Sequence, residues 1–269
     1  MKWSLYCQGM NLHPTFDMLL ERIPETHPIA TEDVSFEIDG QSYIGFVARP
    51  DDDQVHPGVV IFSDWTGIGE YAKVRAQMLA RLGYIAFAGD IYGDGKNPED
   101  PAAEAGRFYG DVALLRSRAA VNLNFLTENV KVDPTRLAVM GYCFGGSAAL
   151  ELARAGAKIT GVVAFHAGLE TGAPAKRDSI TAKLLVLTGG SDPVVPDAAV
   201  VAFENELREA GATDWQLHTY SGAMHAFTIP GVNSPEYGAQ FNALAEARSW
   251  TAMRSFLEEI FTGAKKRQS

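Results

Sequence analysis

The stretch Gly141-Tyr142-Cys143-Phe144-Gly145-Gly146 lies between the apolar run 137–140 and the helix-like run 147–155. This order of strand, turn and helix is typical of a nucleophile elbow, in which a strained turn exposes the nucleophile and small residues let the helix approach the strand. Cysteine stands here where serine is common. The hexapeptide alone leaves a second interpretation open, that Cys143 is a small, buried apolar side chain.

The same alternation of strand and helix continues on both sides of the elbow. A hairpin with its turn at Asp39-Gly40 comes first. Apolar runs that favour buried strands then lie at 58–62, 84–88, 137–140, 161–165, 183–188 and 216–220. Helical periodicity is found at 71–82, 108–126, 147–155, 198–210 and 243–261. Alternating strands and helices predict an α/β fold with a mostly parallel sheet covered by helices on both faces.

The length and the net charge of the chain limit the classes of protein to which it can belong. A chain of 269 residues buries a large core, so we expect one α/β domain at 31–265, with an N-terminal extension at 1–30 packed on it and a polar tail at 266–269. The formal net charge of -10 argues against nucleic-acid binding, which needs a basic face.

The cysteines and the hydropathy pattern suggest a location. Cys7 and Cys143 do not form a disulfide framework, which favours a reducing compartment. The first residues lack the apolar stretch of a secretory signal, and no window approaches the roughly 18 apolar residues of a membrane span. We therefore expect a cytoplasmic protein without a membrane segment.

Three chemically competent residues follow three of the predicted strands. Cys143 forms the elbow, Asp192 lies in Gly189-Gly190-Ser191-Asp192-Pro193, and His225 lies in Gly222-Ala223-Met224-His225-Ala226-Phe227. The carboxyl ends of parallel strands meet at one edge of the sheet, where ligands collect. The order nucleophile, acid, histidine is that of α/β-hydrolases, and it predicts a Cys-His-Asp catalytic triad.

Each residue has a defined role in this hypothesis. Cys143 is the nucleophile, His225 the general base, and Asp192 orients the imidazole. The backbone N–H groups of Phe144 and Trp65 are the candidate oxyanion hole. Taken singly, Asp192 is equally well a turn or cap residue before Pro193, and His225 a histidine in an ordinary loop.

Two further polar residues end predicted strands. His166 follows the strand at 161–165 and is a candidate pocket residue, although a hydrogen bond at the end of the strand explains it equally well. Asp64 follows the strand at 58–62 and either holds the resting thiol or histidine, or caps the next turn. No metal-ligand spacing and no phosphate-binding glycine pattern is present, so we expect no metal and no cofactor.

Five motifs together resemble the dienelactone hydrolase family, the cysteine-nucleophile members of the α/β-hydrolase fold. They are Asp64-Trp65 with Gly67, Gly89-Asp90-Ile91-Tyr92, the elbow hexapeptide, Gly190-Ser191-Asp192-Pro193-Val194-Val195-Pro196, and Met224-His225-Ala226-Phe227. The resemblance covers residues 31–262 and implies an α/β-hydrolase fold with Cys143, His225 and Asp192 as the triad. Further candidate pocket residues, beside His166, are Tyr92, Lys96 and Phe227. The loop 229–238 is a candidate for one wall of the pocket.

The chain departs from the family pattern where substrate is recognised. The family usually has glutamate at the position of Asp64. The family's type enzyme binds the carboxylate of dienelactone with two arginines, at positions where this chain has Asp94 and the segment Phe227-Thr228-Ile229. Lys96 is close in sequence, but an ammonium does not replace the planar fork of arginine. Dienelactone itself is therefore not the expected substrate.

The sequence thus favours a hydrolase that cleaves a small-molecule ester or lactone through a covalent thioester on Cys143. A closely related hypothesis is a thiol-dependent hydrolase that acts on thioesters or another carbonyl compound. The alternative is a catalytically inactive protein of the same fold that binds small molecules or interacts with other proteins.

Overall fold

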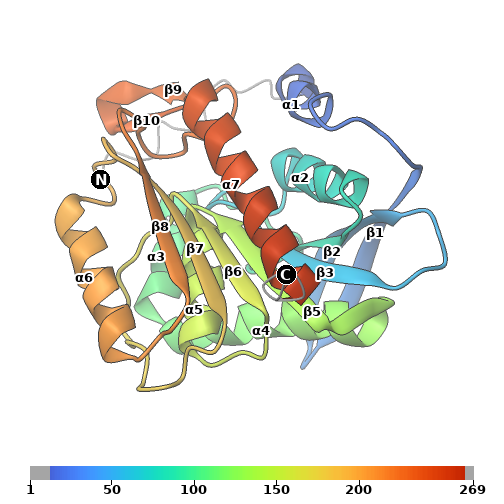
Figure 1. Ribbon diagram of the computed structural model, residues 1–269, viewed down its shortest axis with the longest axis horizontal. Coiled ribbons are helices and arrows are strands. Elements are labelled where there is room, and N and C mark those ends of the chain that lie inside the picture. The colour runs from blue at the N-terminus through green and yellow to red at the C-terminus, as the bar shows by residue number, and fades with distance from the viewer. Residues whose placement is uncertain (1–12, 264–269) are drawn as a thin grey trace, which may run out of the picture.

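A twisted sheet of eight strands runs through the computed structural model, which describes residues 13–263 (Figure 1). The strand order is β1-β2-β4-β3-β5-β6-β7-β8. The strands are β1 (Ile29–Ile38), β2 (Gln41–Pro50), β3 (His56–Phe62), β4 (Ile85–Gly89), β5 (Val132–Tyr142), β6 (Gly161–Phe165), β7 (Lys183–Gly189) and β8 (Trp215–Tyr220). All neighbouring pairs from β4 through β3 to β8 are parallel, whereas β2 pairs antiparallel with both β1 and β4. The predicted mostly parallel sheet is confirmed.

The hairpin of β1 and β2 is built as the sequence predicts. Asp39 and Gly40 both have positive φ, 53° and 76°, which is the conformation of a tight turn whose twist matches the flanking strands. Pairing then runs without a break from Ile38 with Gln41 to Ile29 with Pro50. Since β1 begins at Ile29, the predicted division between residues 30 and 31 falls inside a strand.

Seven helices surround the sheet in the described part of the chain (Figure 1). They are α1 (His13–Leu20), α2 (Glu70–Arg81), α3 (Pro101–Gly110), α4 (Val112–Asn129), α5 (Phe144–Arg154), α6 (Asp197–Glu209) and α7 (Ala243–Thr262). Side chains of β3 alternate between the two faces, because Val59 and Ile61 join the core with α1, α2 and α7, whereas Val60 and Phe62 join the core with α3 to α6. The short strands β9 (Asn233–Ser234) and β10 (Ala239–Gln240) flank a turn of 3₁₀ helix, η2 (Pro235–Tyr237), in the loop after β8.

The single helix predicted over 108–126 is wrong. Two helices, α3 and α4, meet at Asp111, whose backbone is non-helical with φ -128° and ψ 80°. The Asp111 carboxylate accepts a hydrogen bond from the N–H of Leu114 at 3.0 Å and so begins α4. Aspartate is favoured at the start of a helix and is a poor residue inside one, and Gly110 before it is also a weak helix former. The chain therefore ends one helix here and begins another.

The N-terminal helix α1 packs on the core next to α2 (Figure 1). Phe16 and Leu19 are buried there, and the Arg81 guanidinium donates to the carbonyl groups of Leu20 and Ile23, each at 2.9 Å. Cys7 lies outside the described residues.

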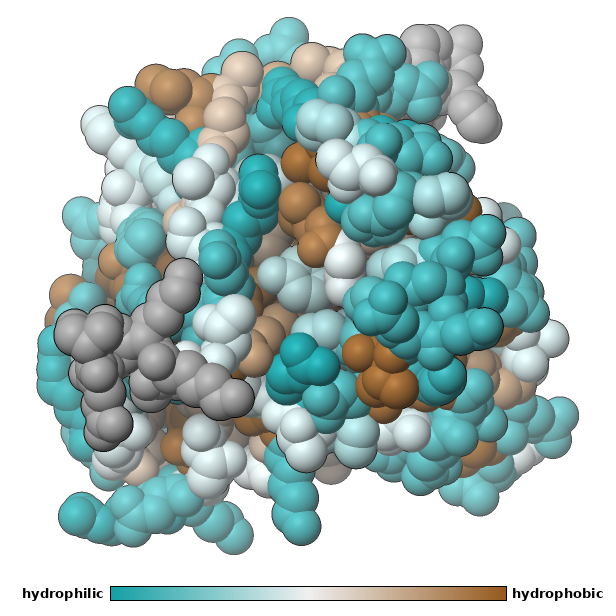
Figure 2. Space-filling view, turned by 45° about the vertical axis from the view of Figure 1, so that its right-hand side comes forward, coloured by the Kyte–Doolittle hydropathy of each residue, from teal (hydrophilic) through white to brown (hydrophobic). Residues whose placement is uncertain are grey.

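The outer face shown in Figure 2 is mostly hydrophilic, with hydrophobic residues in small groups. Within residues 13–263 no helix is both long and apolar enough to cross a membrane.

Candidate active site

Cys143 occupies the turn between β5 and α5. Its backbone has φ 52° and ψ -118°, a region that side-chain-bearing residues rarely adopt. The turn is held because the Cys143 N–H donates to the carbonyl of Phe165 at 2.9 Å and its own carbonyl accepts from Ser147 at 3.1 Å. This is the strained strand-to-helix turn of a nucleophile elbow.

Glycine is required on both sides of this turn. A side-chain carbon on Gly145 would overlap the backbone carbonyl of Ser63, the residue after β3. A side-chain carbon on Gly141 would overlap the backbone of Gly145. The two glycines let α5 begin directly against the ends of β3 and β5, so the start of the helix lies under Cys143.

Cys143, His225 and Asp192 form one chain of hydrogen bonds. The Sγ of Cys143 lies 3.0 Å from Nε2 of His225, and Nδ1 of His225 lies 2.8 Å from Oδ2 of Asp192. The other oxygen of Asp192 accepts from the N–H of Val194 at 2.8 Å, which fixes the carboxylate. The structure therefore brings together the three residues that the sequence predicted as nucleophile, base and orienting acid.

Two loops are locked together around this chain. His225 follows β8, and its backbone forms a bridge with β10, donating to Gly238 at 2.9 Å and accepting from Gln240 at 3.0 Å. Gly238 has φ 80° and packs so closely on Pro193 that a side chain there would overlap the proline ring. The loop that carries His225 is thereby fixed against the loop that carries Asp192.

The environment of His225 favours the imidazolium. Burial by itself lowers the pKa of His225, but the negative charge on Cys143 and the hydrogen bond to Asp192 outweigh burial and raise this pKa to about 10. A protonated imidazole beside a cysteine sulfur is the arrangement that stabilises a thiolate.

A cavity of about 520 Å³ opens beside Cys143 and His225. Its wall is mainly apolar and aromatic, and it comes from the loop after β3, from α1, α2 and α3, and from the loop after β8. Among its wall residues are Phe16, Trp65, Tyr71, Tyr109, Phe144 and Ile229. Ile229 and Val232 belong to the loop 229–238, so the prediction that this loop forms a pocket wall is confirmed.

Tyr92 and Lys96, two of the predicted pocket residues, are not part of the cavity wall. Tyr92 is buried behind the wall, where its hydroxyl donates to the carbonyl of Trp65 at 2.8 Å. Lys96 points its ammonium to Glu104 at 2.8 Å on the surface of α3. These two residues were predicted only because they lie in or near the motif after β4 in the sequence. That position does not determine where their side chains point.

His166 and Phe227 are also absent from the cavity wall, so their prediction as pocket residues is wrong. Both are fully buried. Nε2 of His166 lies 2.7 Å from the hydroxyl of Thr228, which is the hydrogen bond at a strand end that the sequence left open. The His166 ring packs edge-on against the His225 ring at 5.3 Å, and therefore supports the histidine from behind.

Asp64 lies in the cavity wall, but its hydrogen bonds go to its own turn. One oxygen accepts from the N–H of Thr66 at 2.8 Å and from its hydroxyl at 2.6 Å. Burial raises the pKa of Asp64, and the two hydrogen bonds from Thr66 oppose this only in part. Asp64 therefore has the turn-capping role that the sequence left open. The hydrogen-bond partner of the Cys143 sulfur is His225.

The predicted oxyanion residues border the same cavity. Phe144 is the first residue of α5, and the N–H groups of a helix's first turn have no partner within the helix. Trp65 lies in the loop after β3. Both are in the cavity wall, where a substrate carbonyl next to Cys143 would lie.

A buried polar network behind His225 was not predicted. Arg75 of α2 is fully buried and pairs with Glu246 of α7 at 3.0 Å. Arg75 also donates to the Tyr71 hydroxyl at 3.2 Å, and Tyr71 in turn donates to the Thr228 hydroxyl at 2.8 Å, which also bonds His166. The network thus connects two helices to the histidine that supports His225.

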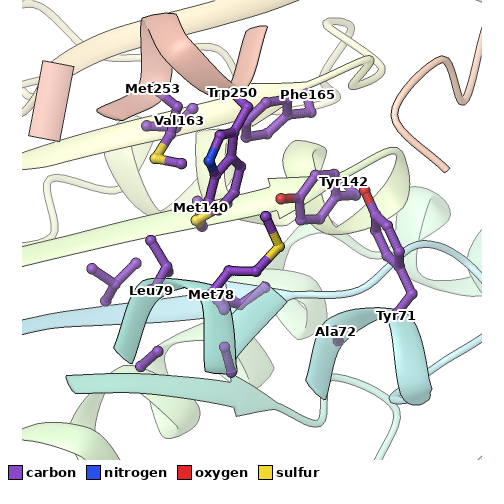
Figure 3. Packing of buried hydrophobic residues seen from close by; sticks show 14 of the residues in the cluster. Tyr71, Ala72, Met78, Leu79, Met140, Tyr142, Val163, Phe165, Trp250 and Met253 are labelled. Atoms are coloured by element: carbon purple, nitrogen blue, oxygen red, sulfur yellow. The ribbon is translucent and has the colours of Figure 1, made fainter. Parts of the chain in front are cut away.

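Aromatic rings enclose the guanidinium of Arg75. The rings of Tyr71, Tyr142 and Trp250 lie 5.1, 5.6 and 4.8 Å from it. Figure 3 shows Tyr142, next to Cys143 in the chain, beside Tyr71 of α2. A charge at this position is stabilised by the faces of the rings and by Glu246. The sequence signal was a single arginine on the apolar stripe of α2.

The sheet order, the elbow and the hydrogen-bonded chain at its edge define a hydrolase of the α/β-hydrolase fold. The model of the dienelactone hydrolase family matches residues 44–261, and the chain belongs to this family, whose members are ester and lactone hydrolases.

Named relatives agree with this class. A Bradyrhizobium protein described as a probable 2-oxo-3-(5-oxofuran-2-ylidene)propanoate lactonase is 28% identical over 214 residues, covering 75% of this chain and 86% of that protein. A solved structure titled m3DLH is 36% identical with a TM-score of 0.82, covering 87% of this chain and 99% of that one. The structure of a dienelactone hydrolase-like promiscuous phosphotriesterase, P91, from metagenomic libraries has 36% identity, the same coverage and a TM-score of 0.81.

Proposed function

We propose that the protein hydrolyses a carboxylic ester or lactone through a covalent thioester on Cys143. The observation that carries this proposal is the chain from Cys143 through His225 to Asp192, with distances of 3.0 and 2.8 Å, beside a cavity of about 520 Å³. A nucleophile within hydrogen-bond reach of a base that a third group orients is the arrangement of covalent catalysis.

The first half of the reaction forms the acyl-enzyme. The Cys143 thiolate attacks the substrate carbonyl carbon, forming a C–S bond, and the carbonyl oxygen gains negative charge next to the N–H groups of Phe144 and Trp65. The C–O bond to the leaving group then breaks, and the His225 imidazolium gives its proton to the departing alkoxide. Asp192 keeps Nδ1 of His225 protonated, so that Nε2 faces the sulfur.

The second half releases the acid. Neutral His225 takes a proton from water, and the resulting hydroxide equivalent attacks the thioester carbon. The C–S bond breaks and the sulfur leaves as thiolate, which restores the ion pair with His225. Atoms balance as ester plus water giving acid plus alcohol, and no cofactor enters.

Turnover of p-nitrophenyl acetate tests the proposal. We expect wild type to be active and Cys143→Ala to lose at least about 10³-fold in kcat, since removing a nucleophile abolishes the covalent route. We expect mass spectrometry of wild type mixed rapidly with substrate to show an acetyl group on Cys143. The control is Thr251→Ala in α7, an exposed residue outside the cavity wall, which we expect to keep activity. Equal activity of wild type and Cys143→Ala would contradict the proposal. It is the result expected of a protein that only binds small molecules.

A second candidate reaction is the hydrolysis of phosphotriesters. P91, which is 36% identical over most of this chain, is described as a promiscuous phosphotriesterase. The mainly apolar cavity suits uncharged triesters. Release of p-nitrophenol from paraoxon by wild type but not by Cys143→Ala supports this reaction, and absence of release from active enzyme rejects it.

A further inference from the structure

Helix α1 contributes directly to the cavity that contains Cys143. Phe16, on α1, lies in the cavity wall and is only 2% exposed. Its ring packs on Tyr71 of α2, another wall residue, with 5.4 Å between the ring centres. One part of the wall is therefore made by a segment far in sequence from the elbow and outside residues 44–261, which match the family.

The segment after Phe16 is fixed on the core by several contacts. Leu19 is completely buried, and the Arg81 guanidinium donates to two carbonyl groups at the end of the segment, those of Leu20 and Ile23. Arg22 forms an ion pair with Glu246 of α7. Phe16 is thus held in place by both neighbouring helices and forms a built part of the cavity.

Apart from the paired His225, the charged side chains of the cavity wall are acidic. Of the wall residues that the structure describes, Asp64 and Glu70 carry carboxylates, His225 is paired with Cys143 and Asp192, and none is lysine or arginine. A substrate carboxylate would lose water without gaining a cationic partner and would face like charges. The rest of the wall is mainly apolar and aromatic, and an apolar group gains free energy there by leaving water.

We propose that α1 is a specificity element of the site, in which Phe16 completes an apolar wall that selects uncharged esters or lactones carrying a bulky apolar group. This inference rests on the proposed function and names its substrate class. The apolar group packs against Phe16 and Tyr71, while the carbonyl lies at Cys143. Anionic lactones and esters are poor substrates because no described wall residue pairs with their carboxylate.

The charge part of the inference is tested with matched substrates. p-Nitrophenyl pentanoate and the mono-p-nitrophenyl ester of glutaric acid have acyl chains of equal length and differ by a terminal carboxylate. We expect kcat/KM for the neutral ester to be at least about tenfold higher, the scale of one lost or mismatched pocket contact. Equal or faster hydrolysis of the glutarate ester overturns this part.

The Phe16 part is tested by the ratio of kcat/KM for p-nitrophenyl benzoate to that for p-nitrophenyl acetate. We expect Phe16→Ala to lower the ratio about tenfold and Phe16→Leu to lower it less, because a bulky group loses more contact than a methyl group. Met18→Ala is the control, since Met18 lies on the same helix but is 40% exposed and outside the cavity wall. A ratio cancels any loss of folded protein.

The outcomes separate this inference from the proposed function. If wild type hydrolyses neither ester, the proposed function fails. If wild type hydrolyses both and the ratio is the same in Phe16→Ala, Phe16→Leu and wild type, the function stands and the role of α1 is rejected. A ratio that falls equally in Met18→Ala also rejects it, because the effect then comes from the helix as a whole.

Discussion

Cys143 holds a backbone conformation that costs about 1–3 kcal/mol for a residue with a side chain. The φ of 52° is maintained because strand β5, helix α5 and the neighbouring carbonyl of Phe165 all fix the turn. The strain places the sulfur at the cavity, 3.0 Å from His225. Cys143, which the sequence predicted as the nucleophile from its flanking glycines, is thus also a residue at which the fold accepts strain so that a half-buried side chain reaches the cavity.

Titration of His225 tests its coupling to Cys143. The pKa of His225 is raised to about 10, chiefly by the negative charge on Cys143 against the opposing effect of burial. Cys143→Ala removes that charge, so we expect the pKa of His225 to fall, while the hydrogen bond to Asp192 remains. Long-range ¹H-¹⁵N NMR of the imidazole over a pH series measures both values. An unchanged pKa in Cys143→Ala would show that the sulfur is not ionised beside His225.

Asp64 is expected to be dispensable for chemistry. Asp64→Asn retains an oxygen that accepts from Thr66 and removes one negative charge from the cavity wall. We expect kcat/KM to change less than about tenfold, the size of one electrostatic contact. The pKa of Asp64 is raised, so wild type loses this proton at higher pH than an ordinary carboxyl group, and the substitution removes that step from the pH profile. A loss as large as that of Cys143→Ala contradicts this view and assigns Asp64 to the thiol.

At the scale of elements, the strands were predictable because buried parallel strands are short, continuous apolar runs. The predicted strand 161–165 coincides with β6, whereas α5 begins at Phe144, three residues before the predicted start. The early start depends on Gly145 fitting against the Ser63 carbonyl, a tertiary contact that no local pattern reveals. The break at Asp111 was missed for a different reason, since the apolar stripe continues across it and only the cap marks it.

Gly145→Ala tests the close approach of α5 to β3. The added carbon would overlap the Ser63 carbonyl, which belongs to a backbone that cannot rotate away. We expect the free energy of unfolding to fall by about 1–3 kcal/mol, as for other overpacked sites, and kcat/KM to fall because the first N–H groups of α5 shift. Urea denaturation measures the stability. The control is Gly110→Ala at the end of α3, where a side-chain carbon meets nothing within 4 Å. Equal stability of the two variants would contradict the contact.

At the scale of the whole molecule, the sheet topology made it possible to predict Cys143, Asp192 and His225. It did not make it possible to predict which residues line the cavity. Cys143, Asp192 and His225 follow parallel strands, and parallel strands end at a common edge. The cavity wall depends on which side chains of several packed elements point inward, and Phe16 joins it only because α1 folds back onto α2. Candidate pocket residues chosen by sequence proximity, such as Lys96, therefore failed.

The buried pair of Arg75 and Glu246 links the helices on one face of the sheet to the support of His225. Burial opposes the charge on Arg75, but the surrounding groups outweigh it and raise its pKa, so Arg75 stays charged. Glu246→Gln leaves that charge without its counter-ion, and we expect a loss of about 3–5 kcal/mol in the free energy of unfolding. Arg75→Met should cost less, because the Glu246 carboxylate then keeps Arg22 as its partner.

A double-mutant cycle measures the coupling. In Arg75→Met with Glu246→Gln no unpaired charge remains from this pair, so the combined loss should be smaller than the sum of the single losses. The matched control is Lys73→Met, also on α2, whose partner Asp33 is 67% exposed; its loss should not exceed about 1 kcal/mol. Additive losses in the cycle, or a loss for Lys73→Met as large as for Arg75→Met, would contradict a buried ion pair that holds α2 and α7 together behind the active site.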